Sequence, residues 1–285
     1  MPASRQISDI LNTAVAHHKA GHLADAEAQY LLVLDLDPKN ADVLTMLGAI
    51  AHTRGDSGQA IVFFDRALAA SPQFTSALFN KAVALDETGQ SQGALAAYRA
   101  CLEVSPDHGD AALKLGILLH GQGDFSAAKT VFQKLLALQP RNPRVHYNLG
   151  HCLFAAGDRD GAHTHLTAAL SLDPCSTSTL LILSNLHADL LQFDDAIRTI
   201  RQAIVIEPDN PEFQTVLGNC LIQAGQNDAA IETHRRACAL APQTPKFVNN
   251  LGAALLANGQ PEEARTALSE AVRLDPLYTD RKSVV

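Results

Sequence analysis

The side chains of this sequence that could do chemistry are mostly amides. Of its twelve asparagines, seven fall inside segments with helical periodicity, where asparagine is a poor residue. A side-chain amide both donates and accepts hydrogen bonds, so it can pair with the backbone of a peptide of any sequence. The other five lie at predicted turns or segment ends, where asparagine is expected: Asn40, Asn142, Asn210, Asn227 and Asn258. The chemistry that the seven amides favour is recognition of a polypeptide backbone.

Catalytic and metal-binding arrangements do not stand out beside these amides. His163 and His165 are two residues apart, so on a helix they point away from each other, and no carboxylate or cysteine lies at ligand spacing. The chain has no P-loop, no GxSxG motif and no pair of carboxylates in an apolar setting. We therefore expect no enzymatic activity, no cofactor and no metal site. His18, His52 and His120 lie at multiples of 34 residues, which indicates either separate solvated side chains or a strip of histidines.

That spacing belongs to a repeat that runs through almost the whole chain. Proline recurs every 34 residues from Pro38 to Pro276, and alanine fills one place in every unit from Ala26 to Ala264. A glycine keeps the same period except in the sixth unit, where Leu191 replaces it, so we expect a locally reshaped hairpin there. The period divides the chain into an N-terminal tail, eight units and a C-terminal tail: 1–6, 7–40, 41–74, 75–108, 109–142, 143–176, 177–210, 211–244, 245–278 and 279–285.

Each unit predicts two amphipathic helices joined by a tight turn. In residues 41–74, Leu44 and Ala51 lie on one face of the first helix, and Gly55 followed by Asp56 breaks the pattern. Glycine allows a positive φ at the end of one helix, and aspartate caps the start of the next. Three units open on proline, which suits the first turn of a helix. Small residues recur where the two helices would cross. Because every unit predicts two helices and no strand, the predicted fold is all-α.

A 34-residue unit of helix, turn and helix resembles the tetratricopeptide repeat (TPR), and the match covers 272 of the 285 residues. The resemblance implies an all-α TPR α-solenoid, a right-handed superhelix of eight helix-turn-helix repeats in which each repeat packs on its neighbours. It implies that the first helices line a concave groove, faced by the fifth, sixth and ninth places of each unit. It also implies a scaffold that binds protein or peptide partners.

The seven helical asparagines all occupy these groove-facing places: Asn12, Asn80, Asn148, Asn185, Asn219, Asn249 and Asn250. The predicted site also includes three rings: Phe79, Tyr147 and His151. Such a groove suits an extended peptide with apolar anchors. It does not suit the chaperone tail that some TPR adaptors clamp with cations, because Lys114, Arg144 and Lys246 are scattered. Since asparagine is common at two of these places across the family, the amides are either a binding ladder or an inherited feature.

The repeats also resemble the N-terminal array of O-GlcNAc-transferase-like proteins, which carries an asparagine ladder. In that family a catalytic glycosyltransferase region follows the repeats, and no such region follows them in this sequence. The first hypothesis is therefore a non-catalytic scaffold. The second is the substrate-recruiting part of a larger glycosyltransferase-type enzyme, which a reading frame that continues past Val285 would favour.

The composition argues against several other classes of protein. A net charge of −8 and a pI near 5.8 do not suit a nucleic-acid binder, which needs a basic face for phosphates. No apolar run reaches the roughly 18 residues of a membrane span, and the start MPASRQ lacks the parts of a signal peptide. The five cysteines are odd in number and form no CxxC motif, which favours reduced thiols in a cytoplasmic protein.

The C-terminal end of the array keeps an apolar stripe that a further helix usually covers in TPR arrays. Its residues are Leu268, Ala271, Val272, Leu274 and Leu277. An uncovered apolar face lowers solubility, so we expect it to meet a second copy, another protein or a continuing chain. A homodimer is the favoured hypothesis, because a closed two-fold contact is the commonest way to bury such a face.

Overall fold

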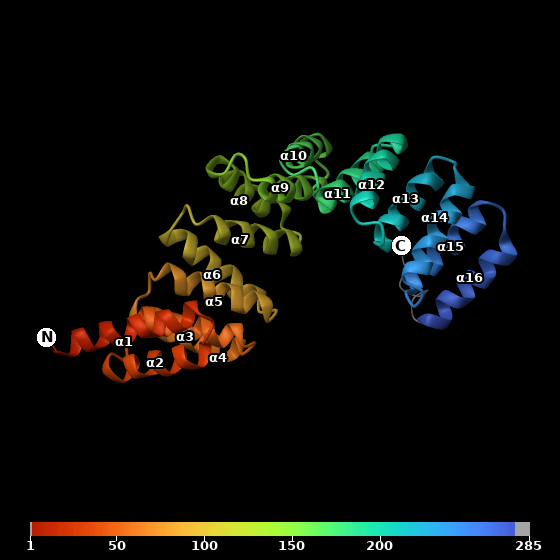
Figure 1. Cartoon of the computed structure of the whole chain (residues 1–285). Coiled ribbons are helices and arrows are strands. Elements are labelled where there is room, and N and C mark those ends of the chain that lie inside the picture. The colour runs from red at the N-terminus through yellow and green to blue at the C-terminus, as the bar shows by residue number, and fades with distance from the viewer. Residues whose placement is uncertain (1, 277–285) are drawn as a thin grey trace. The chain divides into compact units, whose positions relative to one another are not determined.

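The computed structural model describes residues 2–276, and every regular element in that range is an α-helix (Figure 1). Sixteen helices within that range form consecutive hairpins, as the repeat predicts. Their bounds are α1 Pro2–Lys19, α2 Leu23–Leu36, α3 Ala41–Thr53, α4 Ser57–Ala70, α5 Thr75–Glu87, α6 Ser91–Val104, α7 Gly109–Gly121, α8 Phe125–Leu138, α9 Pro143–Ala155, α10 Arg159–Leu172, α11 Thr177–Asp189, α12 Phe193–Ile206, α13 Pro211–Gln223, α14 Asn227–Leu240, α15 Pro245–Ala257 and α16 Pro261–Leu274. Helix α1 extends into the predicted N-terminal tail, and the predicted C-terminal tail lies outside the described residues.

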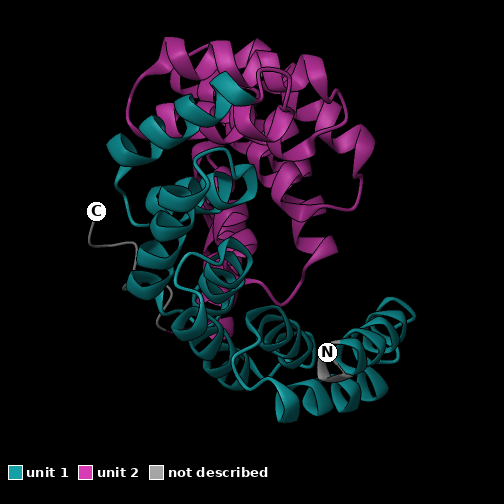
Figure 2. Ribbon diagram, turned by 90° about the vertical axis from the view of Figure 1, so that its left-hand side faces the viewer, with its two compact units in different colours: residues 1–138 teal, residues 139–285 magenta. Residues whose placement is uncertain are grey.

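The chain divides into two compact units, residues 1–138 and 139–285, which Figure 2 shows in different colours. Unit 1 contains α1 to α8, and unit 2 contains α9 to α16. Within each unit a helix packs most extensively on its hairpin partner and then on the nearest helix of the adjacent hairpin. Each repeat therefore buries its apolar surface mainly against its neighbours, which is how a solenoid gains stability.

The helix starts confirm the expected capping chemistry. Asp56 Oδ1 accepts a hydrogen bond from the N–H of Gln59 at 2.9 Å, and Asp158 Oδ1 accepts one from Gly161 at 3.0 Å. Helices α9, α13 and α15 each begin at a proline, where the missing N–H would have no partner within the helix. At these helices the local sequence favours the observed start.

Each hairpin is closed by a small residue of its first helix that lies against a large residue of its second. A Cβ atom added to Gly48 would lie 2.5 Å from the Phe64 ring, and one added to Gly116 would lie 2.4 Å from Phe132. The alanines that recur in the second helices, from Ala26 to Ala264, are fully buried. A larger side chain at either place would force the two helices apart, because interiors of this kind have no spare volume.

The turn of the sixth repeat is not reshaped, so that expectation was wrong. Among the described turns, seven contain a glycine with φ between 71° and 83°, and Leu191 takes the same conformation with φ 59°. Its N–H donates to the carbonyl of Ala188 at 3.0 Å, and the N–H of Gln192 donates to that of His187 at 2.8 Å. The other turns make the same two hydrogen bonds, so the hairpin geometry prevails over the preference of leucine.

Replacing Leu191 with glycine should raise the free energy of unfolding of unit 2 by about 1 kcal/mol. The left-handed conformation costs leucine about that much, and its side chain is 75 % exposed, so little packing is lost. Urea unfolding followed by circular dichroism measures the change. Gly157→Ala in the preceding turn is the matched control: its φ is 82°, an added Cβ would meet nothing within 4 Å, and stability should fall. If Leu191→Gly leaves the free energy of unfolding unchanged while Gly157→Ala lowers it, then Leu191 is not strained by its positive φ.

The seventh repeat carries a histidine in the hairpin core. His234 occupies the place that Phe64 and Phe132 fill in other repeats, and it is fully buried against Gly218. Neither ring nitrogen has a hydrogen-bond partner among the described residues. Burial lowers the pKa of His234 to about 4, because an imidazolium there would lose its hydration. The ring is therefore neutral in the folded protein.

Acid should weaken unit 2 through this histidine. The unfolded chain takes up the proton near pH 6.5, whereas the folded chain resists it until about pH 4, so stability is present above pH 6.5 and falls between those values. The full effect amounts to about 3 kcal/mol. His234→Phe should abolish that part of the pH dependence, and Phe132→His should introduce a similar one in unit 1. Equal pH profiles for the wild type and His234→Phe would contradict the assignment.

Candidate functional site

The first helices of successive repeats contact one another throughout unit 2 and at one place in unit 1. Helix α3 contacts α5 in unit 1, and α9, α11, α13 and α15 contact one another in sequence in unit 2. Among the described helices, successive second helices do not pack on each other in this way. We call the odd-numbered helices of each unit its inner helices, because the resemblance places the binding residues on them.

Unit 2 brings four of the predicted asparagines onto consecutive inner helices. Asn185 lies on α11, Asn219 on α13, and Asn249 and Asn250 on α15. Asn219 is exposed and the other three are half-buried. Their side-chain amides make no hydrogen bond within the described part of the chain. We call these four residues the amide face, because their donors and acceptors remain available to a ligand.

Helix α9 contributes a different surface. The Nδ2 group of Asn148 donates to the carbonyl of Arg144 at 2.7 Å, so this amide is used within its own helix. Tyr147 and His151 lie one turn apart on α9, with ring centroids separated by 5.9 Å. Both side chains are half-buried, and burial raises the pKa of the Tyr147 hydroxyl. Helix α9 thus offers aromatic surface beside the amide face, whereas Asn148 adds no free amide to it.

Unit 1 does not assemble a comparable series. Asn12 lies on α1 and Asn80 on α5, with α3 and its partly exposed Met46 between them. The Phe79 ring packs on His108 at 4.8 Å between centroids, and it also contacts the buried Tyr98 at 6.2 Å. Phe79 is half-buried, as Tyr147 is, and part of its ring lies against these neighbours, so its place in the binding site stays a prediction.

One of the cations on the inner helices of unit 2, Lys246, is used in an ion pair. Lys246 Nζ lies 2.7 Å from Glu212 Oε2 across the α13–α15 contact. Both side chains are about half exposed, so the pair adds little to stability, but it occupies the lysine. That the protein does not clamp a carboxylate tail with successive lysines and arginines stays a prediction.

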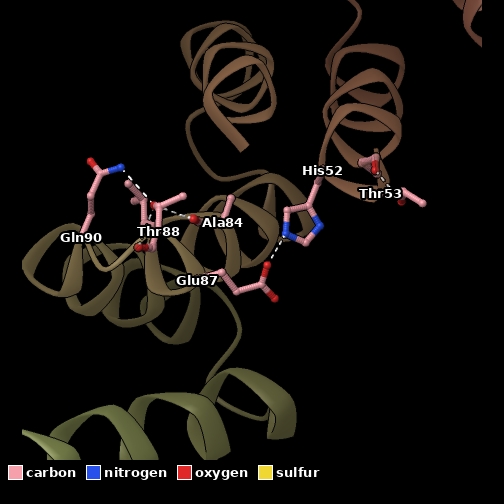
Figure 3. Close-up of polar contacts among 8 residues, drawn as sticks. His52, Thr53, Ala84, Glu87, Thr88 and Gln90 are labelled. Atoms are coloured by element: carbon pink, nitrogen blue, oxygen red, sulfur yellow. Dashed lines mark hydrogen bonds and ion pairs between the residues drawn. The ribbon is translucent and has the colours of Figure 1, made fainter. Parts of the chain in front are cut away.

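The histidines that recur at the end of the first helices have separate partners. Figure 3 shows His52 reaching from α3 to Glu87 of α5, with 2.7 Å between Nε2 and the carboxylate oxygen. His18 Nδ1 lies 3.4 Å from the Tyr30 hydroxyl. The His120 ring contacts a neighbouring phenylalanine, and burial lowers its pKa. The structure therefore favours separate side chains over a strip of histidines.

The C-terminal hairpin carries a shallow apolar depression of about 470 Å³. Val272 and Leu256, which are 38 % and 53 % exposed, contribute to it. Leu268 is half-buried and lies against Gly252, so it belongs partly to the hairpin core. Leu274 is half-buried, and Leu277 lies outside the described residues. Leu256 escaped the sequence analysis because it is on the first helix of the pair.

A second hollow, of about 380 Å³, lies among α6, α7 and α8 of unit 1. Leu102, Leu135 and Leu138 line it, together with Arg99 and Lys134. This hollow was not predicted, because its residues lie neither at the groove-facing places nor at the C-terminal end of the array. The apolar residues that α8 leaves exposed, Leu138 above all, were the available signal.

Several comparisons bear on the family of this chain. Models of the tetratricopeptide repeat match residues 11–73, 87–147, 119–176, 153–220, 218–259 and 245–278. A search of curated proteins finds no match. None of the described helices is long and apolar enough to cross a bilayer.

Solved structures share the fold at low sequence identity. A tetratricopeptide repeat protein from Parabacteroides merdae is 18 % identical with a TM-score of 0.64, over 88 % of this chain and 99 % of that one. YrrB, described as a TPR protein with an unusual peptide-binding site, is 18 % identical with a TM-score of 0.58, over 64 % and 93 %. MamA from Desulfovibrio magneticus is 18 % identical with a TM-score of 0.57, over 59 % and 95 %. With sixteen described helices in hairpins of the expected period, this chain belongs to the tetratricopeptide repeat family.

Proposed function

We propose that this protein is a non-catalytic scaffold that binds an extended segment of a partner protein along the amide face of unit 2. The observation that carries the proposal is the series of four free side-chain amides on α11, α13 and α15, the first helices of three successive repeats. An extended backbone presents N–H and C=O groups at regular intervals, and asparagine can satisfy both kinds of group. The peptide-binding site named for YrrB, a protein of the same fold, is in keeping with such a use.

The aromatic surface on α9 could supply the sequence specificity that the amides lack. Backbone hydrogen bonds do not distinguish one peptide from another, so specificity needs a contact with side chains. Tyr147 and His151 lie on the helix that packs beside α11, so a peptide on the amide face could place an apolar side chain against them. The five cysteines carry no disulfide, and we propose that the protein works in the reducing cytoplasm.

The amide face should account for most of the affinity for a peptide selected from a random library against the full chain. The combined change of Asn185, Asn219 and Asn249 to alanine should weaken binding by about 100-fold, at roughly 1 kcal/mol for each lost hydrogen bond. Isothermal titration calorimetry measures the loss. Asn148→Ala is the matched control and should bind as the wild type, because its amide donates to its own helix. Wild-type affinity in the triple variant would remove the proposal.

Methylation of single backbone nitrogens in the selected peptide provides an independent test. If asparagine side chains hold the backbone, N-methylation at every second or third position should cost more than about tenfold in affinity, because a donor is lost. Alanine substitution at those positions should cost much less. If N-methylation has no effect at any position but alanine substitution of the peptide side chains abolishes binding, the asparagines do not hold the peptide backbone.

We further propose that the depression on α15 and α16 holds a second copy of this chain. Leu256 and Val272 are exposed there, and a two-fold contact would cover the same surface on both copies. Replacing both with glutamate should convert a dimer into a monomer without loss of helicity. Leu268 is a poor choice for this test, since it packs on Gly252 within the hairpin. A wild type that sediments as a monomer at tens of micromolar would contradict the dimer.

A further inference from the structure

Three side chains that can ligate a metal meet at the first turn of unit 1, although the spacing of residues in the sequence predicted no metal site. His17 lies in the last turn of α1, His22 directly precedes α2, and Asp25 lies in the first turn of α2. One ligand atom of each lies within 4.8 Å of the others, and His17 Nδ1 is 3.9 Å from Asp25 Oδ2. Within residues 2–276, no other group of three histidine, cysteine or carboxylate side chains comes this close together.

The backbone of the hairpin holds these residues near one another. Gly21 has φ 78°, which reverses the chain between the two helices. The N–H of His22 then donates to the carbonyl of His17 at 2.9 Å, so the two histidines are tied at the main chain. Behind them Ala14 and Ala26 are fully buried where α1 packs on α2. The fold therefore sets the proximity of the three side chains.

The three side chains are not committed to other interactions. His22 stands at the N-cap of α2 but makes no capping hydrogen bond, whereas Asp56 at the same place of the second repeat caps α4. Within the described residues Asp25 pairs with no lysine or arginine. The adjacent His18 lies beside the Tyr30 hydroxyl instead. A metal ion would thus replace no existing bond of His22 or Asp25.

The sixth repeat lacks the histidine that corresponds to His22, and it shows how the side chains at the three positions interact in that case. Its residues at the same three positions are His187, Gln192 and Asp195. There His187 Nδ1 lies 3.0 Å from Gln192 Oε1, and Asp195 is paired with Arg198. Gln192 and Arg198 thus engage the histidine and the aspartate of the sixth repeat. The corresponding residues of the first repeat, His17 and Asp25, have no glutamine or arginine partner of this kind among residues 2–276. The chain therefore contains its own non-binding counterpart of the first turn.

We propose that His17, His22 and Asp25 bind one zinc ion that clips the first hairpin together. Two imidazoles and one carboxylate are a usual ligand set for zinc, with metal–ligand bonds of about 2.0–2.2 Å. Such bonds in a tetrahedron set the ligand atoms about 3.3 Å apart, which these half-buried or exposed side chains reach by rotation. Three protein ligands leave a fourth position for water or for a side chain of a bound partner.

The test is a titration of the full chain, freed of metal with a chelator, with Zn²⁺ alone. We expect one ion per chain, and slower hydrogen exchange at the α1–α2 turn once it is bound. His22→Gln reproduces the pair of the sixth repeat and should lower the affinity more than about tenfold, as should Asp25→Asn. Co²⁺ in place of zinc should give visible ligand-field bands without the charge-transfer absorption of a thiolate ligand.

Matched variants separate this site from other zinc ligands. His187→Gln changes the corresponding residue of the sixth repeat and should leave the affinity unchanged, as should Cys175→Ser at the exposed thiol. The double change Gln192→His with Arg198→Gln should create a second site and raise the stoichiometry to two. Unchanged zinc binding by His22→Gln, a thiolate band with Co²⁺, or a stoichiometry that stays at one in the double variant would each overturn the assignment.

Discussion

The structure depends on how closely two helices approach within each repeat. A glycine, alanine or serine on the first helix lets a large residue of the second lie directly on the backbone, as Gly116 does for Phe132. That contact sets how closely the two helices of a hairpin approach, and each hairpin presents the next one with an apolar surface. Because the contact recurs every 34 residues, the first helices of unit 2 also recur in a regular series. These helices carry the four asparagines of the amide face.

The seventh repeat shows how far this packing tolerates exceptions. His234 replaces an aromatic or aliphatic residue, yet the hairpin keeps its contacts with Gly218, because a neutral imidazole has nearly the shape of a phenyl ring. Leu191 similarly adopts the backbone conformation of glycine. Both cases lie in unit 2, close to the amide face in the chain. The repeat geometry is therefore stronger than the preference of any one residue within it.

The sequence predicted the helices well, because proline, glycine and alanine act locally and recur at one period. It could not predict which amides are free. Asn148 and Asn185 both stand at groove-facing places, but only the structure shows that Asn148 turns back to the carbonyl of Arg144. Nor could it show that the Phe79 ring packs on His108, since these two residues stand near opposite ends of the repeat 75–108. The turn at Leu191 was misread because a residue preference was given more weight than the hydrogen bonds that close the hairpin.

The most direct measurement is the nuclear magnetic resonance spectrum of the asparagine side-chain amides, recorded with and without a selected peptide. If the account is right, the NH₂ signals of Asn185, Asn219, Asn249 and Asn250 shift on binding, because each amide exchanges water for a peptide group. The signals of Asn142 and Asn210, which bond within their own turns, should stay in place. Binding that leaves the four amides of the amide face unshifted would contradict the central claim.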